Sequence, residues 1–132
     1  ADITALYNGN PAGILAVLSV LTDEFLLRVE RRGRSLAERL RAVDSDEIVD
    51  VRGKGLMIGA EVRSERDAIL RLLQRERVLA IPAGPGVIRF LPPYIVEEDQ
   101  MEYVGRAFEA ALAAIRTDRD FSAAEGAGCA VS

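Results

Sequence analysis

The sequence lacks histidine and tryptophan altogether, and its 132 residues include one lysine, Lys54, and one cysteine, Cys129. Without histidine, the chain has neither the commonest general base nor the commonest metal ligand of proteins. A single cysteine cannot form a disulfide within the chain, which favours a reducing compartment such as the cytoplasm. The sequence therefore predicts no metal site and offers no complete set of catalytic residues.

Long apolar runs and an excess of positive charge are also missing. No run reaches the length of a membrane-spanning helix, and the chain does not start with the basic segment of a signal peptide. There are 17 basic and 21 acidic residues, whereas nucleic-acid-binding proteins usually carry a basic excess or stripe. We therefore expect neither a membrane nor a nucleic acid as a partner.

What is present is the composition of one globular domain, because 49% of the residues are hydrophobic and 29% are charged. Hydrophobic periodicity predicts helices over about residues 10–21, 22–43, 64–77 and 97–116. Apolar and β-branched runs predict strands over about residues 47–52, 56–62, 78–82 and 87–91. This order predicts an α+β fold in which helices cover one face of a small antiparallel or mixed sheet of three to four strands.

The predicted domain occupies residues 10–116. It follows an N-terminal segment, residues 1–9, and precedes a tail rich in alanine, glycine and serine, residues 117–132, which we expect to be flexible. The first helix has apolar residues on nearly every face, and one domain of this size cannot surround it. We therefore expect a partner surface against that helix.

Three single residues carry local predictions. Gly33 falls within the apolar stripe of the second helix and indicates a close contact with another helix. Gly59 interrupts the second strand and indicates a bulge or a close backbone approach. Ser64 is expected to cap the third helix.

Arg89 is the charged residue within the apolar run of residues 87–91. Alternation along a strand would place Arg89 on one side of the sheet, and Ile88 and Phe90 on the other. A guanidinium in this setting is either paired within the protein or reserved for an anion, because an unpaired buried charge is costly. Its planar fork suits a carboxylate. From the residues alone, a structural ion pair (with Glu61 as a candidate partner) and ligand binding are equally open.

For three further features a structural interpretation is favoured over a chemical one. The run Gly84-Pro85-Gly86 joins two strands and does not precede a helix, so it predicts a plain turn and not a phosphate cradle. Lys54 lies between two glycines, where it is expected to be solvated, whereas an imine-forming lysine needs a desolvated pocket. Cys129 has no base or orienting partner near it in the sequence.

Three segments occur in an order and spacing that resemble a known family. They are Asn8-Gly9-Asn10-Pro11 followed by the apolar helix, Val51-Arg52-Gly53-Lys54-Gly55-Leu56-Met57-Ile58-Gly59, and Ile88-Arg89-Phe90-Leu91-Pro92-Pro93. Together they resemble the C-terminal part of class III pyridoxal-phosphate-dependent aminotransferases, over about residues 7–115. The branch that handles acetylornithine, ornithine and carrier-bound lysine or aminoadipate semialdehyde is the most similar.

The resemblance implies the small C-terminal domain of a fold-type I enzyme. Such an enzyme acts as a homodimer on an amino acid and a 2-oxo acid, in amino-acid biosynthesis. Its pyridoxal 5'-phosphate would sit on a lysine of a large domain that would precede Ala1, so this chain alone would lack the catalytic lysine and be inactive. Arg89 matches the arginine that commonly binds the substrate α-carboxylate, which favours ligand binding over a structural pair.

The first of the three segments departs from the family pattern. The family has a threonine there that contacts the cofactor phosphate of the neighbouring subunit, but Leu6 stands at that position and Asn8 replaces a glycine. Thr4, two residues earlier, is the candidate cofactor-binding residue of this chain. The alternative to a transaminase domain is a non-catalytic α+β module that binds a small carboxylate through Arg89, or a protein partner or second copy through the apolar helix.

Overall fold

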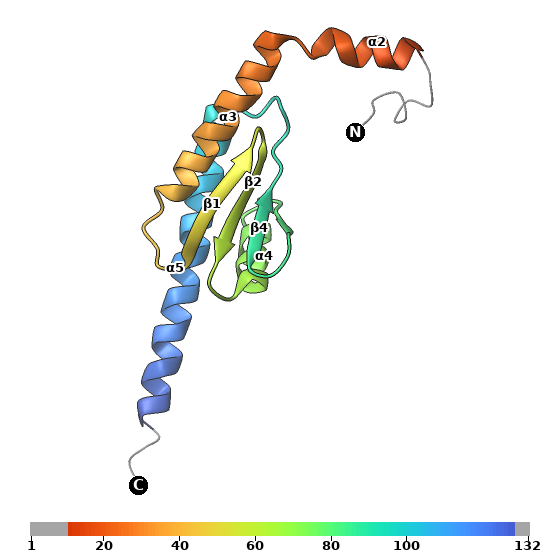
Figure 1. Cartoon of the computed structure of the whole chain (residues 1–132). Coiled ribbons are helices and arrows are strands. Elements are labelled where there is room, and N and C mark those ends of the chain that lie inside the picture. The colour runs from red at the N-terminus through yellow and green to blue at the C-terminus, as the bar shows by residue number, and fades with distance from the viewer. Residues whose placement is uncertain (1–10, 129–132) are drawn as a thin grey trace.

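A four-stranded antiparallel sheet lies at the centre of the computed structural model, which describes residues 11–128 (Figure 1). The sheet order is β1-β2-β4-β3, which places two hairpins side by side. The strands are β1 (Ile48–Lys54), β2 (Met57–Val62), β3 (Ile81–Pro82) and β4 (Val87–Phe90). The predicted α+β class and the predicted strand number are therefore confirmed, and the sheet is wholly antiparallel.

Three helices pack on one face of this sheet, namely α3 (Asp23–Arg41), α4 (Arg66–Arg75) and α5 (Glu98–Gly128). A fourth helix, α2 (Pro11–Val20), precedes them in the chain. Helix α3 contacts β1 and β2, α4 contacts β3 and β4, and α5 packs against both α3 and α4. Along β2 the residues Ile58, Ala60 and Val62 are buried, while the alternate positions are exposed or half-buried. One face of the sheet is therefore covered and the other is open.

The hydrophobic core fills the space between the covered face and the helices. The sheet contributes Ile58 and Ile88, and the helices contribute fully buried side chains from α3, α4 and α5, namely Leu36, Leu40, Ile69, Leu73, Met101, Phe108 and Leu112. Phe90 of β4 meets Phe108 of α5 edge to face, with ring centroids 5.7 Å apart. The apolar stripes predicted for the second and last helices form this core.

Helix α3 is capped by Thr22, the first residue of the helix predicted over residues 22–43. The Thr22 hydroxyl accepts a hydrogen bond from the Phe25 amide at 3.1 Å, and two acidic residues follow in the first turn. The prediction that Gly33 contacts another helix is wrong. Gly33 faces the turn between β1 and β2, where a Cβ atom would lie 1.8 Å from the Gly55 carbonyl oxygen. The bare face of this glycine lets the helix approach the turn.

Helix α4 starts one residue later than a Ser64 cap would place it. Its N-cap is Glu65, which has a left-handed backbone (φ 56°) and makes no side-chain cap. The prediction for Ser64 is wrong because its hydroxyl donates instead to the Glu47 carboxylate, at 3.0 Å. Glu47 is a buried carboxylate, and a buried charge requires such partners.

The last helix is longer than the sequence predicted. Helix α5 was expected to end near residue 116, with a flexible tail from residue 117, but it is helical to Gly128. The guanidinium of Arg119 forms an ion pair with Glu47 and lies 3.4 Å from the Ser64 hydroxyl. This contact anchors a turn of α5 that the sequence assigned to the tail.

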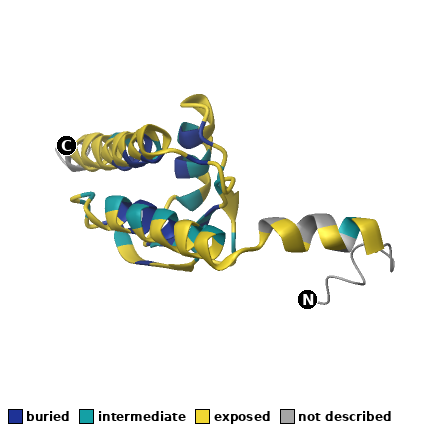
Figure 2. Cartoon of the chain, turned by 90° about the horizontal axis from the view of Figure 1, so that it is seen from above, coloured by how far each residue is buried: buried dark blue, intermediate teal, exposed yellow. Residues whose placement is uncertain are grey.

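Helix α2 extends away from the remainder of the structure (Figure 2). Its described leucines Leu15 and Leu18 and the following Leu21 are 66%, 52% and 42% exposed. The prediction that this domain does not surround its first helix is therefore confirmed. Within residues 11–128, no helix has the combination of length and apolar content that crossing a lipid bilayer requires.

Candidate functional site

Strand β4 divides its side chains between the two faces of the sheet, as the alternation predicted. Ile88 and Phe90 are buried under the helices, and Arg89 lies half-buried on the open face. The backbone that carries Arg89 is held on both sides, because β4 pairs with β2 and with β3. The guanidinium therefore projects from the centre of a rigid sheet and not from a loop.

Arg89 belongs to a row of residues that crosses the sheet. The register pairs Arg52 of β1 with Gly59 of β2, and Gly59 with Arg89. Since Gly59 has no side chain, the strand between the two arginines presents bare backbone. A Cβ atom at Gly59 would lie 3.3 Å from Cγ1 of the Val87 side chain and an ordinary 3.7 Å from the Arg52 carbonyl oxygen, so the predicted close approach of backbone is not found. The pairing runs through this residue without a bulge.

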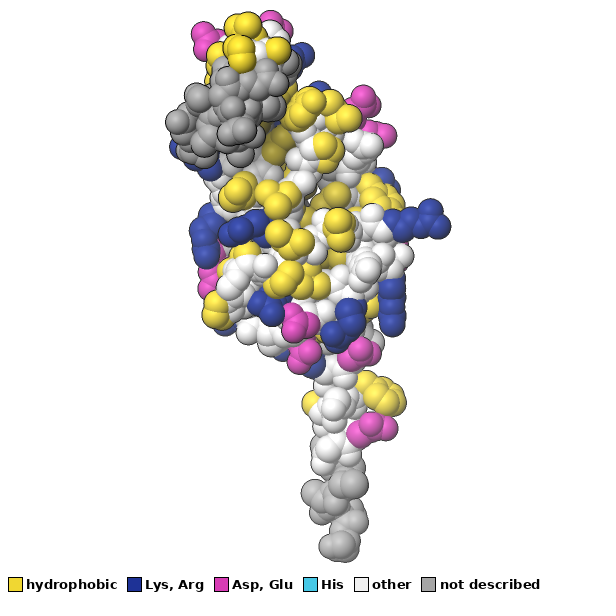
Figure 3. Space-filling model, turned by 90° about the vertical axis from the view of Figure 1, so that its right-hand side faces the viewer, with side chains coloured by type: hydrophobic (Ala, Val, Ile, Leu, Met, Phe, Trp, Pro, Cys, Tyr) yellow, Lys and Arg dark blue, Asp and Glu magenta, His cyan; other side chains and the backbone are white. Residues whose placement is uncertain are grey.

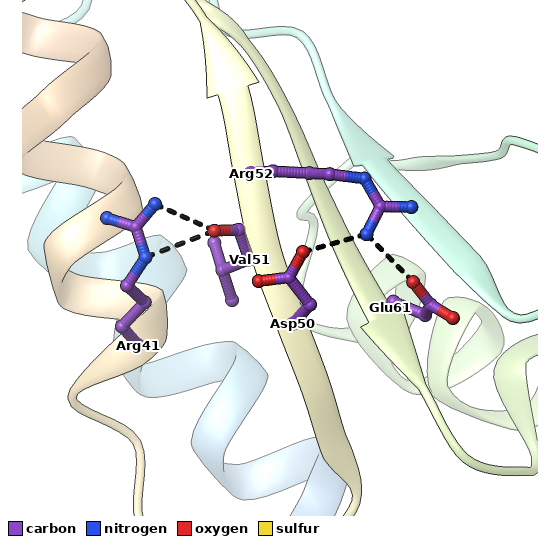
Figure 4. A network of polar contacts seen from close by, with 5 residues as sticks. All are labelled: Arg41, Asp50, Val51, Arg52 and Glu61. Atoms are coloured by element: carbon purple, nitrogen blue, oxygen red, sulfur yellow. Dashed lines mark hydrogen bonds and ion pairs between the residues drawn. The ribbon is translucent and has the colours of Figure 1, made fainter.

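Two carboxylates hold Arg52 on the open face (Figure 4). Its Nη1 atom donates to Oε2 of Glu61 at 2.8 Å and to Oδ2 of Asp50 at 2.9 Å. These hydrogen bonds raise the pKa of Arg52, and the one to Glu61 has the larger effect. The hydrogen bond from Arg52 lowers the pKa of Asp50. With one guanidinium and two carboxylates, the formal charges of this network sum to one negative unit.

Glu61 is thus bound to Arg52, and the structural ion pair that the sequence left open for Arg89 is absent. The guanidinium of Arg89 makes no hydrogen bond and no ion pair with any group of residues 11–128. The other half-buried arginines in that range are each held by a polar partner, Arg32 by the Tyr94 carbonyl, Arg39 by Glu98 and Arg66 by the Gly84 carbonyl. Arg89 is therefore the half-buried arginine of this range whose guanidinium has no polar partner.

The remaining contact in Figure 4 ties α3 to the edge of the sheet. Both Nε and Nη2 of Arg41 donate to the Val51 carbonyl oxygen, at 3.1 and 2.7 Å. A guanidinium over a backbone acceptor of an edge strand also hinders pairing with another strand. This contact fixes β1, and through it the position of Arg52.

Two features singled out in the sequence, Lys54 and the run of residues 84–86, contribute nothing to this site. Lys54 is exposed at the end of β1, as predicted. The run of residues 84–86 is a connecting turn, with positive φ at Gly84 (75°) and Gly86 (71°), so the prediction of a plain turn is confirmed. Thr4 and Cys129 lie outside the described residues. Within residues 11–128 no group of three or more acidic or cysteine side chains is arranged to hold a metal ion.

An apolar groove lies between α5, the segment after α4 and the loop after β4. Among its lining residues are Leu79, Leu91, Pro92, Pro93 and Tyr103. Leu79 and Leu91 are 82% and 51% exposed, and Figure 3 shows hydrophobic side chains gathered across the face of the molecule that it presents. Arg89 does not line this groove, so the groove and the cation are separate features.

Sequence reasoning missed Asp50 and Arg52 as parts of the site. The signal was present, since Asp50 and Arg52 alternate on one strand and Glu61 lies opposite on the next. Recognising it required the exact register of the hairpin, which the composition of a Gly-Lys-Gly turn does not specify.

Comparison with known proteins gives one family. Residues 3–112 match the family described as aminotransferase class-III. The chain is 38% identical over 112 residues to the [LysW]-aminoadipate semialdehyde/glutamate semialdehyde transaminase of Sulfurisphaera tokodaii, covering 80% of this chain and 29% of that protein. It is 37% identical over 112 residues to the acetylornithine aminotransferase of Corynebacterium efficiens, covering 81% of this chain and 27% of that protein.

Solved structures give the same result. An ornithine aminotransferase from Toxoplasma gondii superimposes with a TM-score of 0.73 at 27% identity, over 85% of this chain and 29% of that one. The N-acetylornithine aminotransferase from Stenotrophomonas maltophilia superimposes with a TM-score of 0.71 at 25% identity, over 80% of this chain and 31% of that one. The chain thus spans between a quarter and a third of the length of these relatives.

Proposed function

Because the chain belongs to the class-III aminotransferase family, we propose that it forms the small C-terminal domain of a pyridoxal-phosphate-dependent transaminase. The proposed substrates are an amino acid that reacts through a side-chain amine, as the names of the acetylornithine aminotransferases suggest, and a 2-oxo acid that accepts the amino group. The fold-type I neighbours support this assignment. The proposed compartment is the cytoplasm.

In this function Arg89 binds the carboxylate of the substrate. The observation that carries the proposal is the half-buried guanidinium on the open face, which has no polar partner among residues 11–128. A guanidinium fork accepts a carboxylate through two parallel hydrogen bonds, which fixes the direction of the ligand as well as its distance. Because the backbone of Arg89 is held in the middle of the sheet, the bound ligand would be oriented for reaction elsewhere in the enzyme.

The residues described here do not by themselves form a site for pyridoxal phosphate. The cofactor acts as an electron sink and is carried on a lysine. Lys54 is exposed beside two glycines, and nothing in its surroundings excludes water from it. We therefore assign the holding of the cofactor to the remainder of the polypeptide, and to this chain the orientation of the substrate. Thr4 stays a candidate contact to the cofactor phosphate.

The test compares Arg89→Ala with the unchanged complete protein on two substrates. Acetylornithine carries the carboxylate, and N-acetylputrescine is the same molecule without it. Hydrogen bonds between charged groups contribute about 1.5–3 kcal/mol, so kcat/KM for acetylornithine should fall about tenfold to a hundredfold. The value for N-acetylputrescine and the absorbance of the bound cofactor should change little.

Arg89→Lys is the matched control, since it keeps the charge and removes the fork, and its effect should be intermediate. If both substrates lose activity equally, or if neither does, Arg89 does not bind the carboxylate.

The proposal includes a homodimer. Its support is the exposed apolar surface of α2 and the start of α3, where Leu15, Leu18, Leu26 and Leu27 are all at least half exposed. Contiguous apolar surface of this kind normally marks an interface. Light scattering of the complete protein should give the mass of two chains. A stable monomer that binds a carboxylate without pyridoxal phosphate would favour the non-catalytic module instead.

A further inference from the structure

Glu61 lies between two arginines on the open face of the sheet. Gly59 pairs with Arg52 on one side and with Arg89 on the other, and Glu61 is two residues beyond Gly59 on the same face. Glu61 is therefore a diagonal neighbour of both arginines. Diagonal neighbours on adjacent strands are about 7–8 Å apart, which long charged side chains can span.

The structure shows which of the two arginines Glu61 binds. Its Oε2 atom accepts a hydrogen bond from Arg52 at 2.8 Å, and it forms no ion pair with Arg89. Asp50 lies on the same strand as Arg52 and binds the same nitrogen at 2.9 Å, which holds the guanidinium of Arg52 in place (Figure 4). Arg52 therefore carries two carboxylates while Arg89 carries none.

We propose that Arg52 is a positioning residue which keeps the Glu61 carboxylate away from Arg89, so that Arg89 stays available to the substrate carboxylate. The inference rests on the proposed role of Arg89. Without Arg52, the carboxylate of Glu61 would be free to pair with its other diagonal neighbour, Arg89, and would then compete with the carboxylate of the ligand. Arg52 in this account does not touch the substrate.

The kinetic test uses Arg52→Ala in the complete protein, with acetylornithine as the probe. Competition from an exposed ion pair should raise KM about fivefold while kcat changes little, because the competitor blocks binding and not the later steps. Adding Glu61→Gln to this variant removes the competitor, and KM should return to within about twofold of the original value. Arg52→Lys, which keeps a cation beside Glu61, should behave like the unchanged protein.

The matched control is Arg34→Ala, which removes an exposed arginine paired with Glu30 on α3 and with neither Glu61 nor Asp50. It should leave KM unchanged. Where Arg89→Ala impairs the use of acetylornithine, an Arg52→Ala variant with unaltered KM would overturn the inference. So would a double variant as impaired as the single one, because that result would mean that Arg52 is structural or binds the substrate itself.

A second measurement does not depend on activity. A crystal structure of the complete Arg52→Ala protein without substrate should show the Glu61 carboxylate within about 4 Å of the Arg89 guanidinium. If Glu61 stays away from Arg89 in that structure, the inference fails even where Arg89 does bind substrate. If Glu61 moves to Arg89 but Arg89→Ala leaves acetylornithine kinetics unchanged, the inference about Arg52 holds and the proposed role of Arg89 fails.

Discussion

Glu98 shows how a single charge ties two helices together. It lies in the first turn of α5, where its carboxylate accepts a hydrogen bond from the Ser35 hydroxyl at 2.9 Å and another from Arg39 of α3 at 3.2 Å. The hydrogen bond from Ser35, followed by that from Arg39, lowers the pKa of Glu98 below its ordinary value. A negative charge at this end of a helix is also favoured by the helix dipole.

This lowered pKa predicts a pH-dependent effect of Glu98→Gln. A carboxyl group whose pKa is lower in the folded than in the unfolded state stabilises the fold above the unfolded-state pKa, and this contribution is lost as the pH falls through the folded-state pKa. At pH 7 the variant should therefore melt at a lower temperature than the original protein. The difference should vanish well below the ordinary glutamate value of 4.5. Melting curves by circular dichroism across this range would measure it, and a difference that persists in acid would exclude the charge as its cause.

Arg89 shows how far residue patterns lead towards a site. Its position on the open face followed from the alternation of an apolar strand, because Ile88 and Phe90 had to face the core. Its lack of a partner did not follow, since Glu61 could reach either of two arginines. That choice depends on the register of two hairpins and on Asp50, which the sequence alone does not place.

At the scale of elements, α3 and the β1–β2 turn lie so close together that only glycine fits at position 33 of the helix. A Cβ atom on Gly33 would lie 1.8 Å from the carbonyl oxygen and 2.5 Å from the carbonyl carbon of Gly55. Both atoms belong to backbone, so neither can move without shifting the turn that joins the two strands. The spacing between helix and sheet is thus set by this glycine.

Gly33→Ala should therefore destabilise the protein. Alanine favours a helix over glycine by about 1 kcal/mol, but overpacking a tight contact costs about 1–3 kcal/mol, so the net effect is a loss. Gly105→Ala is the matched control, because Gly105 is buried within α5 and a Cβ atom there would lie at an ordinary 3.6 Å from Cβ of Arg39. That variant should gain up to about 1 kcal/mol. Urea unfolding of both variants measures the difference, and equal stabilities would contradict this account.

The elements that the sequence misjudged depend on contacts between distant segments. The start of α4 and the end of α5 were both misplaced because Ser64 and Arg119 bind the buried Glu47. Local propensity described Ser64 as a cap and the residues after 116 as a tail. Neither prediction could take the Glu47 carboxylate into account, because the fold brings it to Ser64 and Arg119 from a distant part of the sequence. Elements whose ends are set by local signals, such as α3 at Thr22, were placed correctly.

At the scale of the whole molecule, the charged residues of the candidate site and the core lie on opposite faces of one sheet. The helices cover one face and form the core, while the other face carries Arg89 and the network of Arg52, Asp50 and Glu61. The exposed leucines of α2 lie apart from this sheet (Figure 2). An open, charged face does not enclose a ligand by itself. This distribution therefore fits the proposed role, in which the domain contributes Arg89 to a site that other parts of the enzyme complete.

This arrangement predicts that the 132-residue chain has no cofactor chemistry by itself. Incubation with pyridoxal phosphate followed by borohydride should trap no stoichiometric adduct on Lys54, because an exposed lysine lacks the desolvated surroundings that an imine-forming lysine needs. Mass spectrometry of the reduced protein measures this directly. The complete protein carrying Lys54→Ala is the matched control, and it should still trap one cofactor per chain. A stoichiometric adduct on Lys54 in the isolated chain would instead place the cofactor on this domain. No second domain would then be needed to hold the cofactor.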